Sequence, residues 1–596
     1  MNHHSASSRA RAAVVAGALV VGAVACARSA QQSDTAPTTT TTPSGSAAMP
    51  AAPGGLPLKF DPRPTTAAIS PVDLMSRLYV FADDSMQGRD TGSPGHIKST
   101  QWIADQLRAL GLEPAGENGT YFQEVPMISR RLDPNARLTV GDRALVPFTD
   151  FVAALARGTP RSISGAAAVY AGVLGDTANR LPAAQLTGKV AVFRMTGPQA
   201  ATSPAVPLNS FANAGDARAI VLVADQLPPN VVAQARTPAV TAPAAGASAS
   251  APPVRATIYM TSSAAEALFG APVASVAPGT VGKSFASEIG FAESRVPARN
   301  VIAIIRGSDP ALRNTYVALG AHNDHVGYRV GASVDHDSLK LVNAYRNTLE
   351  MALPENATAE QRVAVLRQVA AYVPNLDSVR AIRPARRDSI FNGADDDGSG
   401  SVGLLEIAEA VAKSPTKPKR SLLFVWHTGE EKGLLGARWF SEHMTVPRDS
   451  IIAQVNIDMI GRGGADDIRG GGPNYVQIIG ARRLSSQLGE HVEAVNRAQP
   501  TPLTIDYSWD AAGHPQNIYC RSDHYHYARW GIPVAFIWTG LHGDYHQMTD
   551  EPQYIDYEHM ARIANFTHDV AVGLANREQR LVIDGVKLDP NGGCRQ

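Results

Sequence analysis

Leu422-Leu-Phe-Val-Trp-His-Thr-Gly-Glu-Glu431 is the stretch of sequence that decides the fold class. It starts as a short apolar run typical of a buried strand and ends in one histidine and two glutamates. Helix-type segments such as 402–412 and 481–497 separate it from further strands. The other strand-type runs are 301–305, 316–319, 452–457 and 534–537. The alternation predicts an α/β fold with a mixed, mainly parallel sheet sandwiched by helices.

The length of 596 residues exceeds what a single core usually spans, so more than one domain is expected. Between 151 and 292 short β-type runs alternate with Gly- and Pro-rich loops. We interpret this segment as an inserted β-rich domain rather than as loops of one large domain. The main domain would then comprise 58–150 and 293–596. Within it, 328–390 is a polar, helix-prone insertion.

The N-terminal segment differs in composition from the rest of the chain. Arg9 and Arg11 precede an apolar run over 12–25, which is typical of an export signal and too short to span a bilayer comfortably. Ala23-Val-Ala-Cys26 resembles a bacterial lipobox, so we expect 1–25 to be a lipoprotein-type signal peptide. Residues 26–57 would be a flexible tether. The chain is therefore expected in the periplasm or cell envelope, bound to the membrane by a lipid anchor at Cys26, or otherwise secreted.

Charge and cysteine content exclude some classes of partner and site. Lys plus Arg and Asp plus Glu both total 54, so there is no electrostatic case for a nucleic-acid partner. Beyond Cys26 only Cys520 and Cys594 remain. They could pair in an oxidising compartment or stay as free thiols, and the sequence leaves both possibilities open. A zinc site would have to use histidines and carboxylates.

Side chains of the metal-ligand type follow the predicted strands. Functional groups in α/β sheets gather where strands end. The groups are His322-Asn-Asp-His325, the loop 393–400, Glu430-Glu431, Asp458, and His542-Gly-Asp-Tyr-His546. Carboxylates brought together repel one another, and divalent cations relieve that repulsion. Histidine and carboxylate without cysteine favour zinc, and an odd carboxylate between two such sets favours two metal ions. Calcium prefers an all-oxygen shell, so the histidines argue against a calcium site.

The motifs resemble those of a known family. It is the zinc peptidase family that includes the secreted bacterial leucyl aminopeptidases, glutamate carboxypeptidase II and the transferrin receptor. The similar pieces are Gly320-Ala-His-Asn-Asp-His-Val-Gly327, Gly393-Ala-Asp-Asp-Asp-Gly-Ser-Gly400, Trp426-His-Thr-Gly-Glu-Glu-Lys-Gly-Leu-Leu-Gly436, Asn456-Ile-Asp-Met-Ile-Gly461 and Asp544-Tyr-His546. The resemblance covers roughly 70–125 and 300–575, and the inserted domain resembles a protease-associated domain.

The resemblance implies a role for each matching residue. Asp396 would bridge two zinc ions. His322 and Asp458 would complete the ligands of one ion, and Glu431 and His546 those of the other. Glu430 would be the general base, acting on a water that bridges the ions, and the Asp396–Asp397 peptide bond would be cis. Asp324 would orient the ring of His322.

The implied activity is removal of N-terminal residues from peptides that carry a free N-terminus. The nearest alternative is a carboxypeptidase or dipeptidase on the same site. It would need arginines for the substrate carboxylate, and Arg329, Arg462 and Arg521 are the candidates. A one-zinc glutaminyl cyclase fits less well because those relatives lack a histidine equivalent to His322. A receptor-like or peptide-binding lipoprotein without catalysis is a further alternative, although no ligand is missing.

Overall fold

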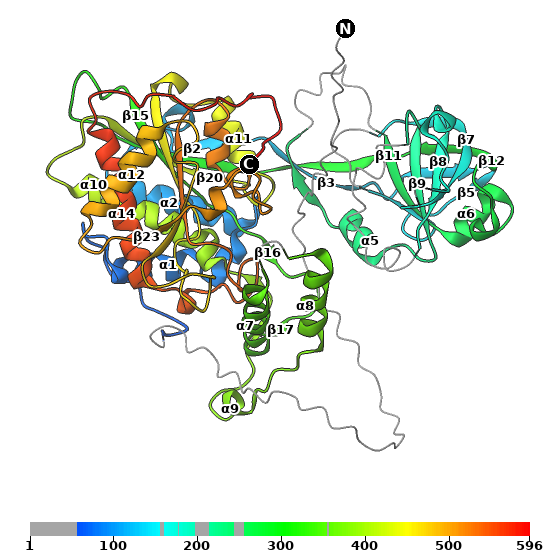
Figure 1. The fold of residues 1–596 in the computed structure, drawn as a ribbon, viewed down its shortest axis with the longest axis horizontal. Coiled ribbons are helices and arrows are strands. Elements are labelled where there is room, and N and C mark those ends of the chain that lie inside the picture. Colours follow the sequence, from blue (N-terminus) through cyan, green and yellow to red (C-terminus); the bar gives the residue numbers. More distant parts are fainter. Residues whose placement is uncertain (1–55, 155–159, 177, 197–213, 244–254, 355–356) are drawn as a thin grey trace, which may run out of the picture. The chain divides into compact units, whose positions relative to one another are not determined.

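The computed structural model describes residues 56–154, 160–176, 178–196, 214–243, 255–354 and 357–596, which form two compact units (Figure 1). The smaller unit spans 126–296, and the described part of the larger unit comprises 56–125 and 297–596. The predicted signal peptide and nearly all of the predicted tether, 1–55, lie outside the described residues. Among the helices described, none has the length and apolar character needed to cross a membrane.

The larger unit is built on a nine-stranded mixed sheet. The strand order is β1 (Glu113–Pro114), β14 (Arg299–Ile305), β20 (Ser421–His427), β15 (Tyr316–His322), β21 (Ile451–Ile457), β24 (Val534–Trp538), β22 (Tyr475–Ile479) and β23 (Thr504–Asp506), and β2 (Phe122–Glu124) pairs with β14. The central strands β20, β15, β21 and β24 are mutually parallel. Strands β14 and β22 run antiparallel to their inner neighbours. The predicted mixed, mainly parallel sheet is confirmed, and its parallel strands lie at the centre.

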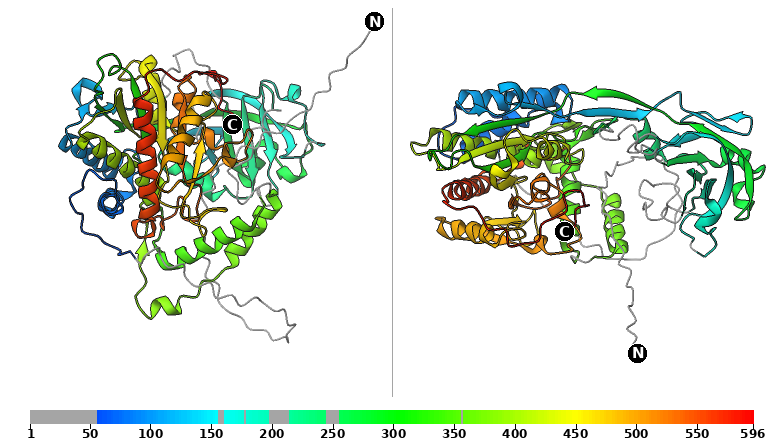
Figure 2. Two further views of the ribbon diagram at one scale, coloured as in Figure 1. Left: turned by 60° about the vertical axis from the view of Figure 1, so that its left-hand side comes forward. Right: turned by 90° about the horizontal axis from the view of Figure 1, so that it is seen from above.

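Helices cover both faces of this sheet because its strands are apolar on both sides. On one face lie α1 (Pro71–Phe81), α2 (Pro94–Ala109), α10 (Gly400–Lys413), α12 (Ser486–Ala498) and α14 (Tyr557–Ala575). Helix α14 packs against α1, α10 and α12 (Figure 2). On the other face lie α11 (Leu435–Glu442) and α13 (His524–Ala528). Successive residues of β14 alternate between the two cores, with Val301 in the first and Ile302 in the second.

Serine caps fix the start of the first two helices. Ser70 and Ser93 each accept a hydrogen bond from a main-chain N–H of the first helical turn, and each is followed by proline. The short connection between these helices contains the 3₁₀ segment η2 (Asp84–Arg89). Its end brings Arg89 and Thr91 to the ends of the central strands.

The segment 328–390 contains the helices α7 (His336–Ala352), α8 (Ala359–Ala371) and α9 (Asp377–Arg380), which Figure 1 shows grouped together. Two short antiparallel pairs connect the segment to the unit: β16 (Gly327–Tyr328) with β19 (Ile390–Phe391), and β17 (Val334–Asp335) with β18 (Arg387–Asp388). The chain thus leaves the sheet just after β15 and returns just before the loop 393–400.

The smaller unit is rich in β structure. Its eight-stranded sheet has the order β5 (Arg143–Ala144), β4 (Arg137–Val140), β12 (Val281–Glu288), β7 (Ile163–Val173), β8 (Val190–Arg194), β9 (Ala219–Ala224), β11 (Ala256–Thr261) and β6 (Phe151–Ala153). A second sheet joins β10 (Ala239–Thr241), β3 (Met127–Leu132) and β13 (Phe291–Val296). The helices α5 (Pro229–Arg236) and α6 (Ser262–Phe269) complete the unit.

The unit begins at Pro126, earlier than the 151 expected from the sequence. Strand β3 pairs with β13 from Met127 to Leu132, and β4 pairs with β12. These early strands hydrogen-bond to the last strands of the same unit, so they cannot belong to the larger one.

Cys520 and Cys594 form a disulfide. The structure thereby decides between the two states that the sequence left open. The bond links the segment just before α13 to the C-terminal end of the chain.

Candidate metal centre and active site

The parallel order of β15, β20, β21 and β24 places their carboxyl ends at one edge of the sheet. His322 is the last residue of β15, and Asp458 directly follows β21. Glu430 and Glu431 lie three and four residues beyond β20, and His546 lies in the loop after β24. The fold therefore brings together all five residues that the resemblance implied as metal ligands.

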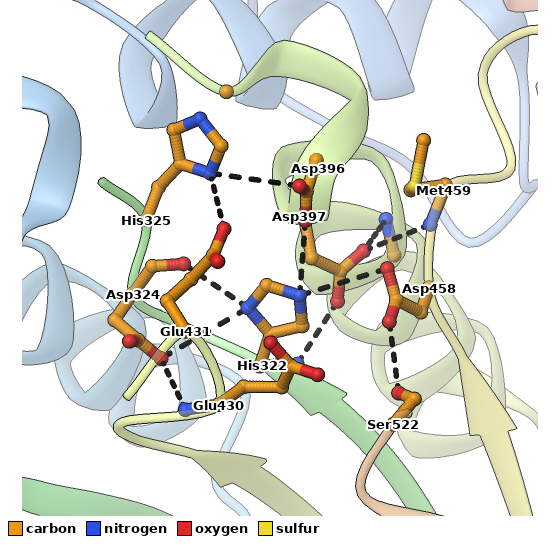
Figure 3. A network of polar contacts seen from close by, with 12 residues as sticks. His322, Asp324, His325, Asp396, Asp397, Glu430, Glu431, Asp458, Met459 and Ser522 are labelled. Atoms are coloured by element: carbon orange, nitrogen blue, oxygen red, sulfur yellow. Dashed lines mark hydrogen bonds and ion pairs between the residues drawn. The ribbon is translucent and has the colours of Figure 1, made fainter. Parts of the chain in front are cut away.

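Asp396 lies at the middle of this cluster (Figure 3). Its Oδ1 is 3.1 Å from His322 Nε2, and its Oδ2 is 3.1 Å from His546 Nε2. Asp458 Oδ1 is 3.6 Å from His322 Nε2 on one side. Glu431 Oε1 is 3.0 Å from His546 Nε2 on the other. One carboxylate thus faces both histidines, as a bridging ligand would.

His325 is a member of the cluster that sequence reasoning missed. Its side chain is fully buried, and Nδ1 lies 2.9 Å from Glu431 Oε1 and 3.8 Å from Asp396 Oδ2 (Figure 3). Among the described residues, His325, Asp396, Glu431 and His546 form one group with a geometry that can hold a metal ion. The available signal was the second histidine of His322-Asn-Asp-His325.

A second group with possible ligand geometry consists of His322, Asp397 and Asp458. The Asp397 carboxylate already accepts hydrogen bonds from the main-chain N–H groups of His322, Gly400 and Met459. Most of its acceptor sites are thereby occupied, whereas the carboxylate oxygens of Asp396 face the histidines. Asp396 is the better third donor for this group. The peptide bond between Asp396 and Asp397 is cis, as the resemblance implied.

Two buried side chains hold the loop that carries Asp396. The Arg89 guanidinium donates to the carbonyls of Asn392 and Gly393 at 2.6 and 2.8 Å. The Asp550 carboxylate accepts from the main-chain N–H groups of Asp395 and Asp396 at 2.9 and 3.1 Å. Burial raises the pKa of Asp550 to about 6. Neither residue was predicted, because each acts from a part of the chain distant in sequence.

Asp324 contacts His322 differently from the expected arrangement. Its main-chain carbonyl oxygen lies 3.0 Å from His322 Nδ1, whereas the nearer carboxylate oxygen lies 3.9 Å from that atom. The carboxylate instead accepts hydrogen bonds from Thr91 Oγ1 at 2.8 Å and from the main-chain N–H of Glu430 at 3.1 Å. Asp324 therefore orients the His322 ring through its backbone and the Glu430 loop through its side chain.

The pKa values of the cluster reflect crowded carboxylates. Burial by itself lowers the pKa of His322, but Asp458 and Asp396 raise it well above its usual value. His546 is raised in the same way by Glu431 and Asp396. Burial by itself would raise the pKa of Glu431, but His546 and His325 hold it at about 2. The raised pKa values of His322 and His546 reflect a cluster that is short of positive charge, which metal ions would supply.

Unpartnered polar atoms support the same fit. His325 Nδ1 and Nε2, Asp396 Oδ2, Glu431 Oε1 and Asp458 Oδ1 are buried without a hydrogen bond of acceptable geometry. Buried polar atoms without partners are costly and uncommon. Here they belong to histidines and carboxylates, the donor types that zinc prefers when cysteine is absent. The residues present therefore fit a zinc centre.

A pocket that is open to solvent adjoins the cluster. Asp396, Glu430 and Asp458 line it together with Ser522, which donates to Asp458 Oδ2 at 2.8 Å. The other lining residues are Met459, Ile518, Arg521, Phe536, Trp538, Leu541 and Tyr545. Burial raises the pKa of Glu430 well above its usual range, reinforced by Glu431 and Asp458. The proposed base thus faces the space where a substrate would lie.

The three candidate arginines lie in different places. Arg521 lines the pocket. Arg462 is buried and forms ion pairs with Asp467 and Asp544. Arg329 donates to the carbonyl of Ala332 in a loop of the insertion. Only the first is placed to meet a substrate.

The chain is therefore an α/β protein with a candidate two-metal centre. Histidines and carboxylates at the ends of its parallel strands form that centre. Residues 372–571 match the family model described as peptidase family M28. The matched segment contains Asp396, Glu430, Glu431, Asp458 and His546 and begins after His322.

Several known proteins are similar to the chain. Leucine aminopeptidase 1 of Uncinocarpus reesii is 28% identical over 228 residues, which cover 35% of this chain and 55% of that protein. Leupeptin-inactivating enzyme 1 of Streptomyces exfoliatus is 28% identical over 156 residues, covering 26% and 31%. An aminopeptidase from Aneurinibacillus sp. strain AM-1 superposes with a TM-score of 0.46 at 18% identity, covering 87% of this chain and 97% of that one. The chain spans about half the length of leucine aminopeptidase 1.

Proposed function

We propose that the chain is an exported, zinc-dependent aminopeptidase that removes N-terminal residues from peptides. The observation that carries the proposal is the position of Asp396, whose two carboxylate oxygens each lie 3.1 Å from a different histidine. The match of residues 372–571 to the peptidase family M28 model and the name of the similar leucine aminopeptidase 1 support the same reaction class.

Two zinc ions would share Asp396. His322 and Asp458 would complete the ligands of one ion, and Glu431 and His546 those of the other, with His325 as a further donor on that side. When bound, such ions polarise a substrate carbonyl and lower the pKa of water towards about 7.

Glu430 would move the proton. Its carboxylate lines the pocket, and its main-chain N–H is held by Asp324. As general base it would take a proton from the attacking water while the water oxygen bonds to the scissile carbonyl carbon. It would then give that proton to the leaving amine nitrogen as the C–N bond breaks. The raised pKa suits a carboxylate that must hold a proton between these two events.

The pocket also explains why an N-terminus would be the recognised end. Asp396 and Asp458 would be neutralised by the metal ions they hold, which leaves Glu430 as the free carboxylate of the pocket. A free α-amino group is cationic near neutral pH and complements that carboxylate. An acylated N-terminus has no charge to offer there.

The test uses leucyl p-nitroanilide, its N-acetyl derivative and a metal chelator. We expect hydrolysis of the free-amine substrate only, loss of activity with the chelator, and recovery on adding zinc. Glu430→Gln should retain its zinc and lose about 10²–10⁴-fold in kcat. Equal hydrolysis of the acetylated substrate would contradict aminopeptidase action, and near-normal turnover of the variant would remove Glu430 from its role.

A carboxypeptidase or dipeptidase on the same site is the second candidate, and Arg521 in the pocket is the observation that favours it. The carboxypeptidase predicts hydrolysis of N-acetyl dipeptides, which have a free C-terminal carboxylate and a blocked N-terminus. The dipeptidase predicts hydrolysis of Leu-Gly but not of Leu-glycinamide or leucyl p-nitroanilide.

Export and lipid attachment at Cys26 belong to the same proposal. They rest on the basic start, the apolar run 12–25 and the lipobox-like Ala23-Val-Ala-Cys26. Fractionation of cells that express the full chain, with labelled fatty acid, tests them. Label and membrane association should both be lost in Cys26→Ser.

A further inference from the structure

The pocket beside the candidate metal centre contains one cationic side chain, Arg521. Around it the walls are largely apolar, with Ile518, Trp538 and Leu541 among them. Guanidinium groups on apolar walls usually bind a carboxylate or stay paired with one of the protein's own. The contacts of Arg521 therefore indicate which kind of ligand the pocket binds.

Arg521 has no ion pair with any carboxylate of the described residues. Its Nη1 lies 3.5 Å from Gln516 Oε1, and its Nη2 lies 3.4 Å from Tyr545 OH. Both contacts are to neutral groups and are long for hydrogen bonds. By contrast, Arg462 near the same loops is held by Asp467 and by Asp544, the latter at 3.0 Å. A half-buried guanidinium with only two weak neutral contacts keeps most of its donors available.

The carboxylates that share the pocket already have roles. Asp396 and Asp458 would be metal ligands, and Glu430 would be the general base. With two dications bound, Asp396 and Asp458 would no longer offset the charge of Arg521. The Cys520–Cys594 disulfide adjoins Arg521 in sequence and ties its backbone to the C-terminal end of the chain. The pocket then presents a positioned cation with apolar walls.

We infer that Arg521 binds a carboxylate of the substrate, which makes it a specificity-determining residue. The inference rests on the proposed function and names its substrate class: peptides that bring a carboxylate into this pocket. The carboxylate has two possible sources. One is the side chain of an N-terminal Glu or Asp, and the other is the C-terminal carboxylate of a dipeptide.

The first arm of the test compares glutamyl and leucyl p-nitroanilide, whose leaving groups are identical. The ratio of their kcat/KM values is the readout, because a general loss of activity cancels in it. If the side chain is the source, Arg521→Gln lowers the glutamyl-to-leucyl ratio at least about tenfold, since a charge-assisted, bidentate contact is lost. Arg521→Lys keeps the charge but loses the bidentate donor geometry of the guanidinium, so it should give an intermediate ratio.

The second arm compares Leu-Gly with Leu-glycinamide, which differ only in the C-terminal carboxylate. If that carboxylate is the source, Arg521→Gln lowers the Leu-Gly to Leu-glycinamide ratio by the same order. Arg329→Gln is the matched control, because Arg329 contacts a carbonyl in its own loop and does not line the pocket. Both ratios should stay unchanged in that variant.

A binding measurement supports the kinetic arms. The Glu430→Gln protein, with zinc bound, is titrated with glutamate and with leucine in a calorimeter. The additional replacement Arg521→Gln should reduce the glutamate-to-leucine affinity ratio. If neither kinetic ratio changes in Arg521→Gln while the wild type still cleaves leucyl p-nitroanilide in a chelator-sensitive way, the inference about Arg521 is overturned and the proposed function is not. Failure of the wild type to cleave any of these substrates would instead contradict the proposed function.

Discussion

At the scale of single residues, His325 is the clearest addition that the structure makes. The sequence shows four polar residues, His322 to His325, at the end of β15, but spacing alone does not say which of their side chains point towards the other loops. His322 ends the strand, and His325 lies beyond it in an isolated β-bridge with Asp90. Its ring lies close to the carboxylates of Glu431 and Asp396, which shows that His325 belongs to the cluster.

Replacing His325 with Ala should weaken one of the two metal sites. The donor group would fall from four side chains to three, and Glu431 would lose its neighbour at 2.9 Å. We expect zinc affinity at this site to fall at least about tenfold, measured by competition with a chromogenic chelator. His443→Ala is the control, because His443 is exposed. Equal zinc affinity in wild type and His325→Ala would show that the residue is not a ligand.

His96 predicts how stability depends on pH. Its ring is buried, with Nε2 2.9 Å from Asn323 Oδ1 and 2.9 Å from Thr428 Oγ1. Burial lowers its pKa from 6.5 to about 4. The unfolded chain therefore binds the proton first as the pH falls. The contribution of neutral His96 to the free energy of unfolding is complete above about pH 6.5. It is lost progressively down to about pH 4, for a total of about 3 kcal/mol.

The measurement is the free energy of unfolding in urea at about pH 7.5 and about pH 5. His96→Gln keeps a donor near the position of Nε2 but cannot titrate. The decrease between the two pH values should therefore be about 2 kcal/mol smaller in this variant than in the wild type. His443→Gln should behave like the wild type. Identical decreases in all three proteins would mean that His96 is not held neutral.

At the scale of elements, α7 supports the loop that carries His546. Lys340 pairs with Asp544, and Asn343 donates to Thr549 Oγ1 at 2.8 Å. Asp544 also accepts from Arg462 and from Thr549. Lys340 and Arg462 together hold the pKa of Asp544 far below its usual value, against the effect of burial. The insertion 328–390 thus contacts the metal-site loop without lining the pocket among the described residues.

Lys340→Met should destabilise the protein by about 2 kcal/mol, because a hydrogen-bonded charge pair in a buried setting is broken. Lys419→Met is the matched control. Its partner Glu578 is 82% exposed, so the loss should stay within about 0.5 kcal/mol. Urea unfolding of both variants measures the difference. Similar losses in the two would contradict a supporting role for α7.

The elements also show how far sequence reasoning reaches. All five strands predicted for the larger unit exist. Runs such as Leu422-Leu-Phe-Val-Trp426 are buried on both faces, so they are apolar throughout and can be recognised without knowing which strand pairs with them. Strands β22 and β23 were missed. Thr504–Asp506 in β23 is short and partly exposed, so its apolar signal is weak. The candidate ligands were found from strand ends, whereas Arg89 and Asp550 act through main-chain groups that no side-chain pattern reveals.

At the scale of the whole molecule, the boundary of the smaller unit was the main difference from expectation. Strands β3 and β4 look like ordinary, partly polar segments in sequence. Their partners β13 and β12 lie more than a hundred residues later, so only the pairing shows that they belong together. Long-range pairing of this kind is invisible to local patterns.

The disulfide should contribute measurably to stability. Cys520 and Cys594 are 74 residues apart, and closing a loop of that size restricts the unfolded chain by about 4 kcal/mol. The double variant Cys520→Ser with Cys594→Ser should therefore unfold at lower urea concentration than the oxidised wild type. Reduced wild-type protein should unfold like the variant. An unchanged midpoint in both would mean that the bond adds nothing to stability in solution.

The zinc content of the purified protein tests the two-metal centre most directly. Elemental analysis of the wild type should give about two zinc ions per chain. Asp396→Ala should lose most of both, because the same carboxylate faces His322 and His546. One or no zinc ion in correctly folded wild type, or two retained in the Asp396→Ala protein, would contradict a shared centre.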